Sequence, residues 1–389
     1  MPTDFDAISE EHLRAAGSMK WSAYPGTIGA WVAEMDFGVA EPIASAVSDA
    51  LSSGLTGYLP AALSTDLAAA TSQWYERRYG WRPDPERIHP VPDVITAYQV
   101  AIERFSAPGS AVIVPTPAYM PFLFVPPMQD RRVIEVPSIE VDGRMTMDLD
   151  GISRAFEDGG GLVVLCNPHN PLGTVFTRTE LLALAEVVDA HDGRVFSDEI
   201  HAPIVYGDTV HVPYASVSEV AAGHTVTAAS ASKAWNLAGL KCAQVILSND
   251  VDAAAWAEFG PWAGHGTATV GVIANIAAYR DGESWLEGVV DYLDGNRRAL
   301  VDGLARHAPH ARVAMPEGSY IALIDLRAYA LEGDLGEWFR ENAQVAMTDG
   351  RACGEAGVGQ VRFVFALPRP LLEVAIERIG AALAGVPLR

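Results

Sequence analysis

The sequence has few positive charges. It contains 389 residues with 27 Lys or Arg against 49 Asp or Glu, which gives a formal net charge of −22. Only three residues are lysines: Lys20, Lys233 and Lys241. A surface this acidic repels the phosphates of nucleic acids and anionic membranes, so we expect neither as a partner.

Cysteines and long apolar runs are also scarce. The three cysteines, Cys166, Cys242 and Cys353, are scattered without paired spacing, which argues against a disulfide framework or a zinc site. The first twenty residues carry charges without the apolar core of a signal peptide. No run approaches the roughly 20 apolar residues that span a bilayer. We therefore expect a cytoplasmic protein without a metal site.

Short apolar runs alternate with longer amphipathic segments in the middle of the chain. The runs predict buried strands at Ala111–Val114, Leu162–Cys166, Arg194–Ser197, Thr225–Ala228 and Gln244–Leu247. Between two of them, Thr177 and Glu180 have capping-box spacing at the start of an expected helix. This alternation predicts an α/β fold with a mainly parallel sheet and helices on both faces.

The C-terminal third has a different pattern. Strands are expected at Tyr320–Leu326 and Val361–Phe365, a long helix at Trp285–His307 and a closing helix at Pro370–Leu383. The chain is long enough for two domains. We expect a smaller α+β domain made of residues 1–44 and 285–389, and a large domain made of residues 45–284.

Polar residues follow four of the expected strands. They lie at Pro115–Tyr119, Asn167–Gly173, Asp198–His201 and Ser230–Lys233. Ligands of a doubly wound sheet bind at the carboxyl ends of its strands, so these segments are the candidates for a functional site.

Two charged residues in these segments have chemistry that depends on burial. Lys233 follows a buried strand among small residues, where desolvation would lower its pKa and make the amine nucleophilic; the alternative is a surface lysine at a helix start. Asp198 ends a strand, and a buried carboxylate needs a cationic partner such as a protonated pyridine nitrogen. The alternatives for Asp198 are a helix cap or, with Glu199 and His201, a metal ligand.

Three other residues have weaker signals. The rigid turn with two prolines could direct Asn170 toward a ligand oxygen, although alone it predicts only a turn. Tyr119 could stack on a flat ring or simply pack in its loop. Arg362, in an expected strand, could hold a substrate carboxylate, or it could form a surface salt bridge.

The ordered set of motifs resembles fold-type I pyridoxal-phosphate enzymes, which have the aspartate-aminotransferase fold. Within them, it is most similar to the cystathionine β-lyases and cysteine-S-conjugate β-lyases of the MalY/PatB type. The similarity spans nearly the whole chain and is carried by Lys20-Trp21, Trp31–Phe37, Gly57-Tyr58, Cys166–Pro171, Ser197–His201, Ser230–Leu240 and Pro316–Tyr320.

The resemblance implies a role for each matching residue. It implies pyridoxal 5′-phosphate as the cofactor, held by Lys233 as a Schiff base and paired through its ring nitrogen with Asp198. Further cofactor contacts are implied for Asn170, Tyr119, His201, Ser230, Lys241, Tyr58 and the backbone near Val94 and Ile95, where a helix dipole favours an anion. Arg362, Ala33 and Tyr119 are implied to bind the substrate, and Lys233, Asp198 and Tyr119 to be catalytic. Tyr58 is implied to reach the neighbouring subunit's phosphate, which predicts a homodimer with a shared active site.

Four positions depart from the common aminotransferase pattern. Lys241 replaces an arginine and offers no bidentate fork, and His201 replaces a tyrosine; both departures resemble the lyases. Asp93 replaces a glycine in the phosphate-binding turn, and we expect its carboxylate to point away from a phosphate. Leu172 replaces a threonine, which would alter packing near the cofactor and with it the choice of substrate.

The resemblance implies a PLP-dependent C–S β-lyase that converts cystathionine or another cysteine S-conjugate, an amino-acid thioether, to thiol, pyruvate and ammonia. Three alternatives stay open. The chain could be an aminotransferase, a binding protein that keeps the cofactor without turnover, or a biosynthetic enzyme that acts on a larger cysteine S-conjugate.

Overall fold

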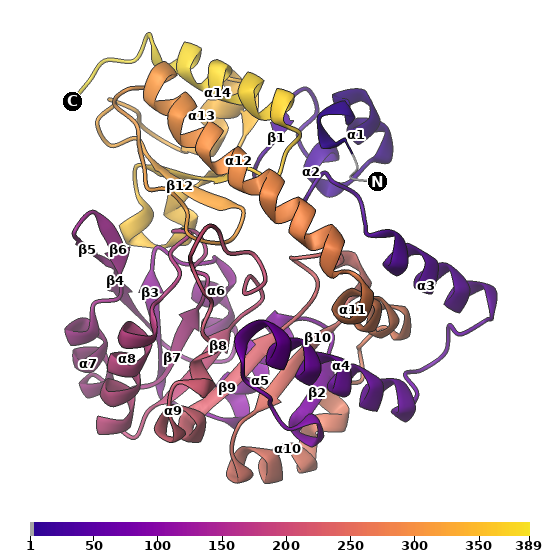
Figure 1. Cartoon of the computed structure of the whole chain (residues 1–389). Coiled ribbons are helices and arrows are strands. Elements are labelled where there is room, and N and C mark those ends of the chain that lie inside the picture. Colours follow the sequence, from indigo (N-terminus) through magenta and orange to yellow (C-terminus); the bar gives the residue numbers. More distant parts are fainter. Residues whose placement is uncertain (1–3) are drawn as a thin grey trace.

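The structure is a computed structural model that describes residues 4–389. Its largest element is a seven-stranded sheet in the order β2-β10-β9-β8-β7-β3-β4 (Figure 1). The strands are β2 Ile88–Val91, β3 Ala111–Thr116, β4 Val133–Pro137, β7 Gly160–Cys166, β8 Arg194–Asp198, β9 Thr225–Ala229 and β10 Ala243–Leu247. Only β10 runs against its neighbours among these seven strands, so the prediction of a mainly parallel sheet is confirmed.

Helices cover both faces of this sheet, because successive strand residues point to opposite sides. Val112 and Val114 pack into one core with α5 Val94–Arg104, α6 Pro121–Met128 and α10 Asp250–Ala263. Ile113 lies on the other side in a core with α7 Leu149–Glu157, α8 Arg178–Ala190 and α9 Glu219–His224. Strands that are buried on both faces read as continuous apolar runs, which explains why the sequence reveals them.

The helix expected from the capping box is α8. Thr177 accepts from the amide of Glu180, and the Glu180 carboxylate accepts from the amide of Thr177. The apolar stripe that follows, including Leu181 and Leu184, is buried against the sheet. Local capping chemistry and packing therefore agree at this helix.

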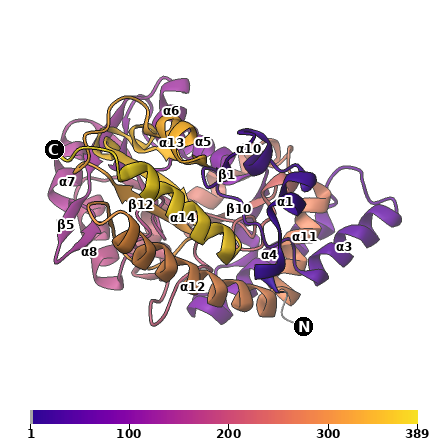
Figure 2. The same ribbon diagram turned by 90° about the horizontal axis from the view of Figure 1, so that it is seen from above.

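A second, antiparallel sheet has the order β11-β12-β15-β14. Its strands are β11 Arg312–Val313, β12 Ile321–Asp325, β14 Thr348–Asp349 and β15 Gln360–Val364. The long helix α12 Glu283–His307 and the last helix α14 Arg369–Leu383 lie side by side next to it, with α13 Leu335–Asn342 (Figure 2). The expected C-terminal strands and helices are thus present.

The N-terminal region contacts the C-terminal one. Strand β1 Ile28–Gly29 pairs in parallel with β13 Val345–Ala346, near α1 Glu10–Ala16 and α2 Met19–Ser22. The chain then forms α3 Glu41–Ser52 and α4 Ala61–Tyr79, which pack on α11 Thr269–Asp281. The domain boundaries near residues 44 and 285 stay predictions.

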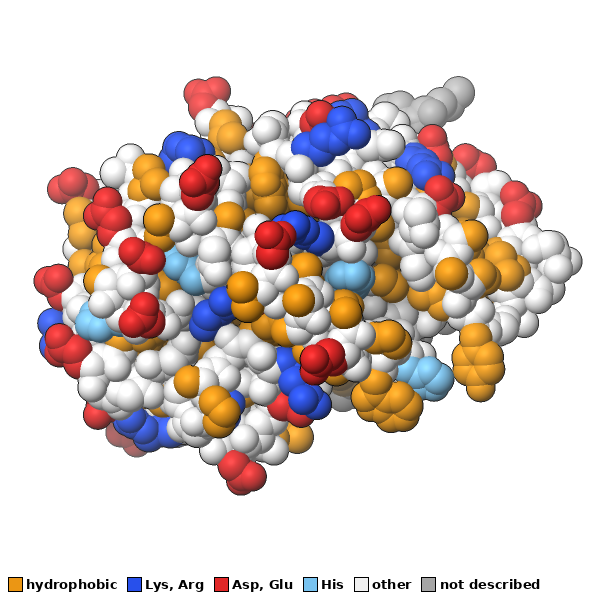
Figure 3. Space-filling view, turned by 90° about the horizontal axis from the view of Figure 1, so that it is seen from below, with side chains coloured by type: hydrophobic (Ala, Val, Ile, Leu, Met, Phe, Trp, Pro, Cys, Tyr) orange, Lys and Arg blue, Asp and Glu red, His pale blue; other side chains and the backbone are white. Residues whose placement is uncertain are grey.

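Two further observations concern the surface. The hairpin of β5 Ile139–Val141 and β6 Arg144–Thr146 projects from the large sheet's edge. Acidic side chains are scattered over the face seen in Figure 3, without a large basic patch. Within residues 4–389, no helix combines the length and apolarity needed to cross a membrane.

Candidate active site

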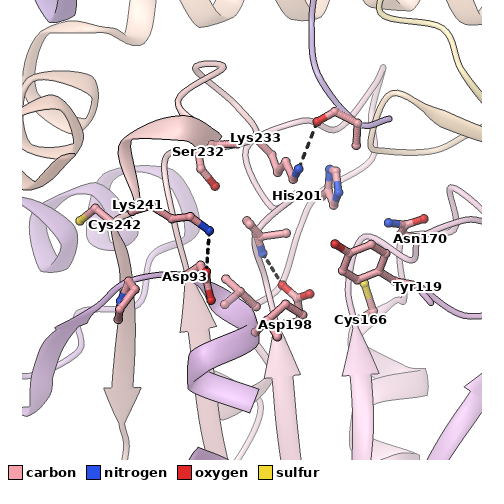
Figure 4. A pocket seen from close by; sticks show the side chains of 16 residues that line it. Asp93, Tyr119, Cys166, Asn170, Asp198, His201, Ser232, Lys233, Lys241 and Cys242 are labelled. Atoms are coloured by element: carbon pink, nitrogen blue, oxygen red, sulfur yellow. Dashed lines mark hydrogen bonds and ion pairs between the residues drawn. The ribbon is translucent and has the colours of Figure 1, made fainter. Parts of the chain in front are cut away.

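A cavity of about 220 Å³ lies at the carboxyl ends of β3, β7, β8 and β9 (Figure 4). Its wall consists of Ala33, Pro92, Asp93, Val94, Ile95, Tyr119, Cys166, Asn170, Asp198, Ile200, His201, Ser232, Lys233, Ala238, Lys241 and Cys242. The polar segments that follow separate strands therefore meet in one place, as parallel strands require.

Lys233 lines this cavity from the segment that follows β9. It lies in a series of turns and not at a helix start, so the surface-helix alternative is wrong. Its Nζ donates to the backbone carbonyl of Ala33 at 3.1 Å. Burial, and then the nearby positive charge of Arg362, lower the Lys233 pKa from 10.5 to about 8. About a tenth of this amine is therefore neutral, and nucleophilic, at pH 7, far more than for a lysine with an ordinary pKa.

Asp198 is the last residue of β8, and only 3% of it is exposed. No helix begins after it, so the helix-cap alternative is wrong. Its Oδ1 accepts from the amide of Ile200 at 3.0 Å, and no residue in the described part of the chain donates to Oδ2. Burial raises the pKa of Asp198 to about 7, although Lys233 opposes this. The carboxylate is therefore a buried acceptor that has room for a cationic partner.

Glu199 and His201 do not form a metal site with Asp198. Glu199 is buried in a separate network, where it accepts from the Tyr75 hydroxyl at 3.1 Å and contacts His211 at 3.3 Å. Within residues 4–389, no group of three His, Cys, Asp or Glu side chains is arranged to hold a metal ion.

Tyr119, Asn170 and His201 line the side of the cavity that lies across from Asp93 and Lys241 (Figure 4). Burial raises the pKa of Tyr119, which keeps its hydroxyl protonated. Burial lowers the His201 pKa to about 3, and its Nδ1 lies 3.1 Å from the Ser319 hydroxyl. The His201 ring is therefore neutral and offers hydrogen bonds instead of charge.

Arg362 comes from β15 in the smaller sheet, and only 2% of it is exposed. Its Nη2 donates to the carbonyl of Trp31 at 2.6 Å, and its Nη1 lies 3.4 Å from Oδ1 of Asn170. Its buried Nε has no partner in residues 4–389, and no carboxylate there pairs with it, so the surface salt-bridge alternative is wrong. A buried guanidinium with an unused donor is suited to an anionic ligand.

The start of helix α5 forms another end of the cavity. The backbone of Val94 and Ile95 lies in its first turn, where amides have no partner within the helix. Asp93 does not point away from the cavity: its Oδ1 accepts from the amide of Thr96 at 2.8 Å, and its Oδ2 pairs with Nζ of Lys241 at 2.9 Å. These contacts lower the pKa of Asp93, so it is ionised and is neutralised by Lys241.

Four expected residues are not part of the cavity wall: Arg362, which reaches it only through its contact with Asn170, and three others. The Ser230 hydroxyl donates to the carbonyl of Cys242 at 2.7 Å, and it is Ser232 that lines the cavity. Tyr58 is 89% exposed and lines a separate hollow with His265. Leu172 lies in a groove beside Pro117. None of these last three side chains lines the cavity in the single chain.

Sequence reasoning assigned no role in the site to several wall residues. Cys166 ends β7, and its Sγ lies 3.5 Å from the carbonyl of Pro168. Its place at a strand end next to the Asn167–Gly173 segment was a usable signal. Ser232 and Cys242 gave no comparable signal, because their orientation depends on the turns that follow β9.

Comparisons with known proteins agree with this geometry. The model of the family "Aminotransferase class I and II" matches residues 32–379. A cystathionine β-lyase of Corynebacterium glutamicum is 38% identical, with 96% of this chain and 98% of the relative covered. The cystathionine β-lyase PatB of Bacillus subtilis is 32% identical over 96% of this chain and 98% of its own.

A solved structure from Corynebacterium diphtheriae, assigned as a PLP-dependent β-cystathionase, superposes with a TM-score of 0.92. It is 40% identical, and the match covers 97% of this chain and 98% of that one. Both the family model and these relatives span the two sheets and the cavity at the carboxyl ends of β3, β7, β8 and β9. The chain belongs to the aminotransferase class I and II family.

Proposed function

We propose that this protein is a pyridoxal-phosphate-dependent C–S β-lyase that converts cystathionine or another cysteine S-conjugate to thiol, pyruvate and ammonia. The observation that carries the proposal is the Lys233 amine in one cavity with the buried Asp198 carboxylate. The names of the relatives, which include cystathionine β-lyases and a PLP-dependent β-cystathionase, support it. The substrate is a small amino acid, as is usual for the family.

The residues present fit pyridoxal phosphate at three points. The Lys233 amine suits the aldehyde, the open Oδ2 of Asp198 suits a protonated ring nitrogen, and the first turn of α5 suits a phosphate. The remaining residues proposed to hold the cofactor are Asn170, Tyr119, His201 and Lys241, together with the amides of Val94 and Ile95 and with Ser232 in place of Ser230. The Tyr119 ring would lie against the flat cofactor ring.

When bound, pyridoxal phosphate supplies an electron sink for negative charge on the carbon that carries the substrate amine. Arg362 binds the substrate carboxylate with its bidentate guanidinium, next to Ala33. Asp198 stabilises positive charge at the far side of the cavity. The buried site excludes water, which strengthens both of these charge interactions.

Lys233 moves the proton that starts the elimination. Once the substrate amine has taken its place on the cofactor, the free and neutral Lys233 amine would accept the proton from the substrate Cα. Its pKa of about 8 lies close to a working pH, where a general base is most effective. The C–S bond then breaks, and its electron pair leaves with sulfur as a thiolate, which takes up a proton. The released enamine is hydrolysed to pyruvate and ammonia.

An aminotransferase is the second candidate, because the family model that matches residues 32–379 is described as aminotransferase class I and II. It would use the same Lys233, Asp198 and Asn170, but would return the proton elsewhere and would need an oxo acid. Purified protein mixed with cystathionine and, separately, with an S-alkyl cysteine distinguishes the two. We expect pyruvate and free thiol without an oxo acid; product formed only with an added oxo acid would contradict the lyase proposal.

We also propose that two chains form a homodimer that shares its active sites through Tyr58. Tyr58 is 89% exposed, and its ring lies 6.0 Å from His265, which stacks on Trp262, itself 80% exposed. Three exposed aromatic rings on one face are typical of a contact surface. Sedimentation of the wild type and of Trp262→Glu tests this: we expect a dimer that the substitution weakens, and a monomeric wild type would contradict it.

A further inference from the structure

Residues 31–36 form a segment without helix or strand that supplies backbone acceptors to the active site. The carbonyl of Trp31 accepts from Nη2 of Arg362 at 2.6 Å. The carbonyl of Ala33 accepts from Nζ of Lys233 and from the hydroxyl of Tyr320, each at 3.1 Å. The positions of the Arg362 guanidinium and the Lys233 amine therefore depend on where this segment lies.

The other side of the segment is held by Lys20, which comes from helix α2. Its Nζ donates to the carbonyl of Glu34 at 3.1 Å and to Oδ2 of Asp36 at 2.9 Å. Its third donor reaches the carbonyl of Ala366 at 2.9 Å, just beyond the end of β15. One ammonium group thus joins α2, the 31–36 segment and the strand that carries Arg362.

Asp36 completes this arrangement, and the pair is almost fully removed from solvent. Its Oδ1 accepts from the Trp21 indole at 2.9 Å, and its amide donates to Ala366. The side chains of Lys20 and Asp36 are 0% and 3% exposed. Breaking such a pair by removing one partner is costly, whereas an exposed pair contributes little.

The segment is also hydrogen-bonded to the turn that carries Lys233. Asn236 accepts from the amide of Met35 and donates to its carbonyl, both at 3.0 Å. The segment therefore lies between the Lys20–Asp36 pair on one side and the Lys233 turn and Arg362 on the other. Neither Lys20 nor Asp36 lines the cavity.

We propose that Lys20 and Asp36 are positioning residues for the reaction. They fix the 31–36 segment so that its carbonyls hold the Lys233 amine and the Arg362 guanidinium in the geometry that the substrate needs. The expected effect on the reaction rate rests on the proposed function. The expected effect on the position of residues 31–36 does not. A displacement of about 1 Å in such a shell can reduce a rate by roughly 100-fold.

Two variants and one matched control test the proposal. Lys20→Met removes the ammonium. Asp36→Asn keeps the shape, removes the charge and turns one of the two acceptor oxygens, which bond Lys20 and Trp21, into a donor. The control is Asp252→Asn, because Asp252 pairs with Arg194, has a side chain that is 4% exposed, and is not part of the cavity wall. Melting temperature, kcat, KM and deuterium uptake of the peptide that covers residues 31–36 are measured for each holoenzyme.

We expect the control to lower the melting temperature while kcat and KM stay within about twofold of the wild type. Lys20→Met and Asp36→Asn should lower kcat/KM by roughly 100-fold, raise KM through Arg362, and increase deuterium uptake in residues 31–36. Kinetics like those of the control, with unchanged uptake, would overturn the proposal. If Lys20→Met does not fold, Asp36→Asn decides.

The same experiment separates this proposal from the proposed function. If the wild type forms no pyruvate, the lyase proposal fails, and KM is replaced by the dissociation constant of L-alanine, read from the visible spectrum of the cofactor. We then expect Asp36→Asn to raise the dissociation constant of L-alanine and to increase deuterium uptake in residues 31–36, whereas the control should change neither quantity. If Asp36→Asn and the control Asp252→Asn gave the same dissociation constant and the same deuterium uptake, the positioning role would be overturned.

Discussion

The pH dependence of cofactor capture tests the burial of Lys233 directly. Only the neutral amine attacks an aldehyde, so the rate of capture follows the neutral fraction. A lysine with an ordinary pKa of 10.5 is neutral in about 0.3% of molecules at pH 8. With a pKa of about 8, roughly half of the Lys233 side chains are neutral at that pH. The enclosed amine should therefore offer roughly 150 times more nucleophile.

The assay mixes apoenzyme with pyridoxal phosphate between pH 6 and 10 and follows the visible absorbance by stopped flow. Free Nα-acetyl-lysine, measured under the same conditions, corrects for the ionisation of pyridoxal phosphate itself. We expect the corrected rate to rise with an inflection near pH 8. Arg362→Met removes the second cause of the lowered pKa, so its inflection should lie higher. A wild-type rate that keeps rising up to pH 10 without an inflection, as expected for a lysine with an ordinary pKa, would refute the reasoning.

Three other outcomes follow from the site. Asp198→Asn should still bind pyridoxal phosphate but lower kcat by at least about 100-fold, because a charge partner is lost in a buried site, and steady-state kinetics checks this. Asp93→Asn keeps an N-cap for α5 while it frees Lys241, so the dissociation constant of pyridoxal phosphate should fall a few-fold at low salt and less at high salt, measured by fluorescence titration. Burial raises the folded-state pKa of Asp198 above its ordinary value of 3.8 to about 7, so its contribution to stability is complete below pH 3.8 and is lost as pH rises through 7. The melting temperature of the apoenzyme, relative to that of Asp198→Asn, should accordingly fall across this range; no difference between the two would contradict it.

The sequence predicts the inner strands of the large sheet well, because burial on both faces makes them apolar throughout. The two edge strands were not predicted. Pro90 interrupts the apolar pattern of β2, and β4 is partly exposed and contains the charged Glu135. The antiparallel direction of β10 could not be predicted from the sequence either. Nothing in the composition of Ala243–Leu247 records direction, which is set by the chain path between β9 and β10.

The candidate site divides in the same way. Residues at strand ends, such as Asp198 and Asn170, could be placed from sequence because the sheet brings all strand ends together. Residues in turns could not: which of Ser230 and Ser232 faces the cavity depends on backbone torsion angles after β9. The contact of Lys20 with Ala366 joins residues that are 346 positions apart in the sequence. No local pattern predicts such a contact or the burial of Lys20 that comes with it.

The covalent link between Lys233 and the cofactor is tested most directly by borohydride reduction of the purified holoenzyme, followed by digestion and mass spectrometry. The chain offers only three lysines, of which Lys20 is held in a buried ion pair and Lys241 is paired with Asp93 at the cavity wall. We predict the pyridoxyl group on the peptide that contains Lys233 and on no other. A modification at Lys20 or Lys241, with Lys233 unmodified, would contradict the account.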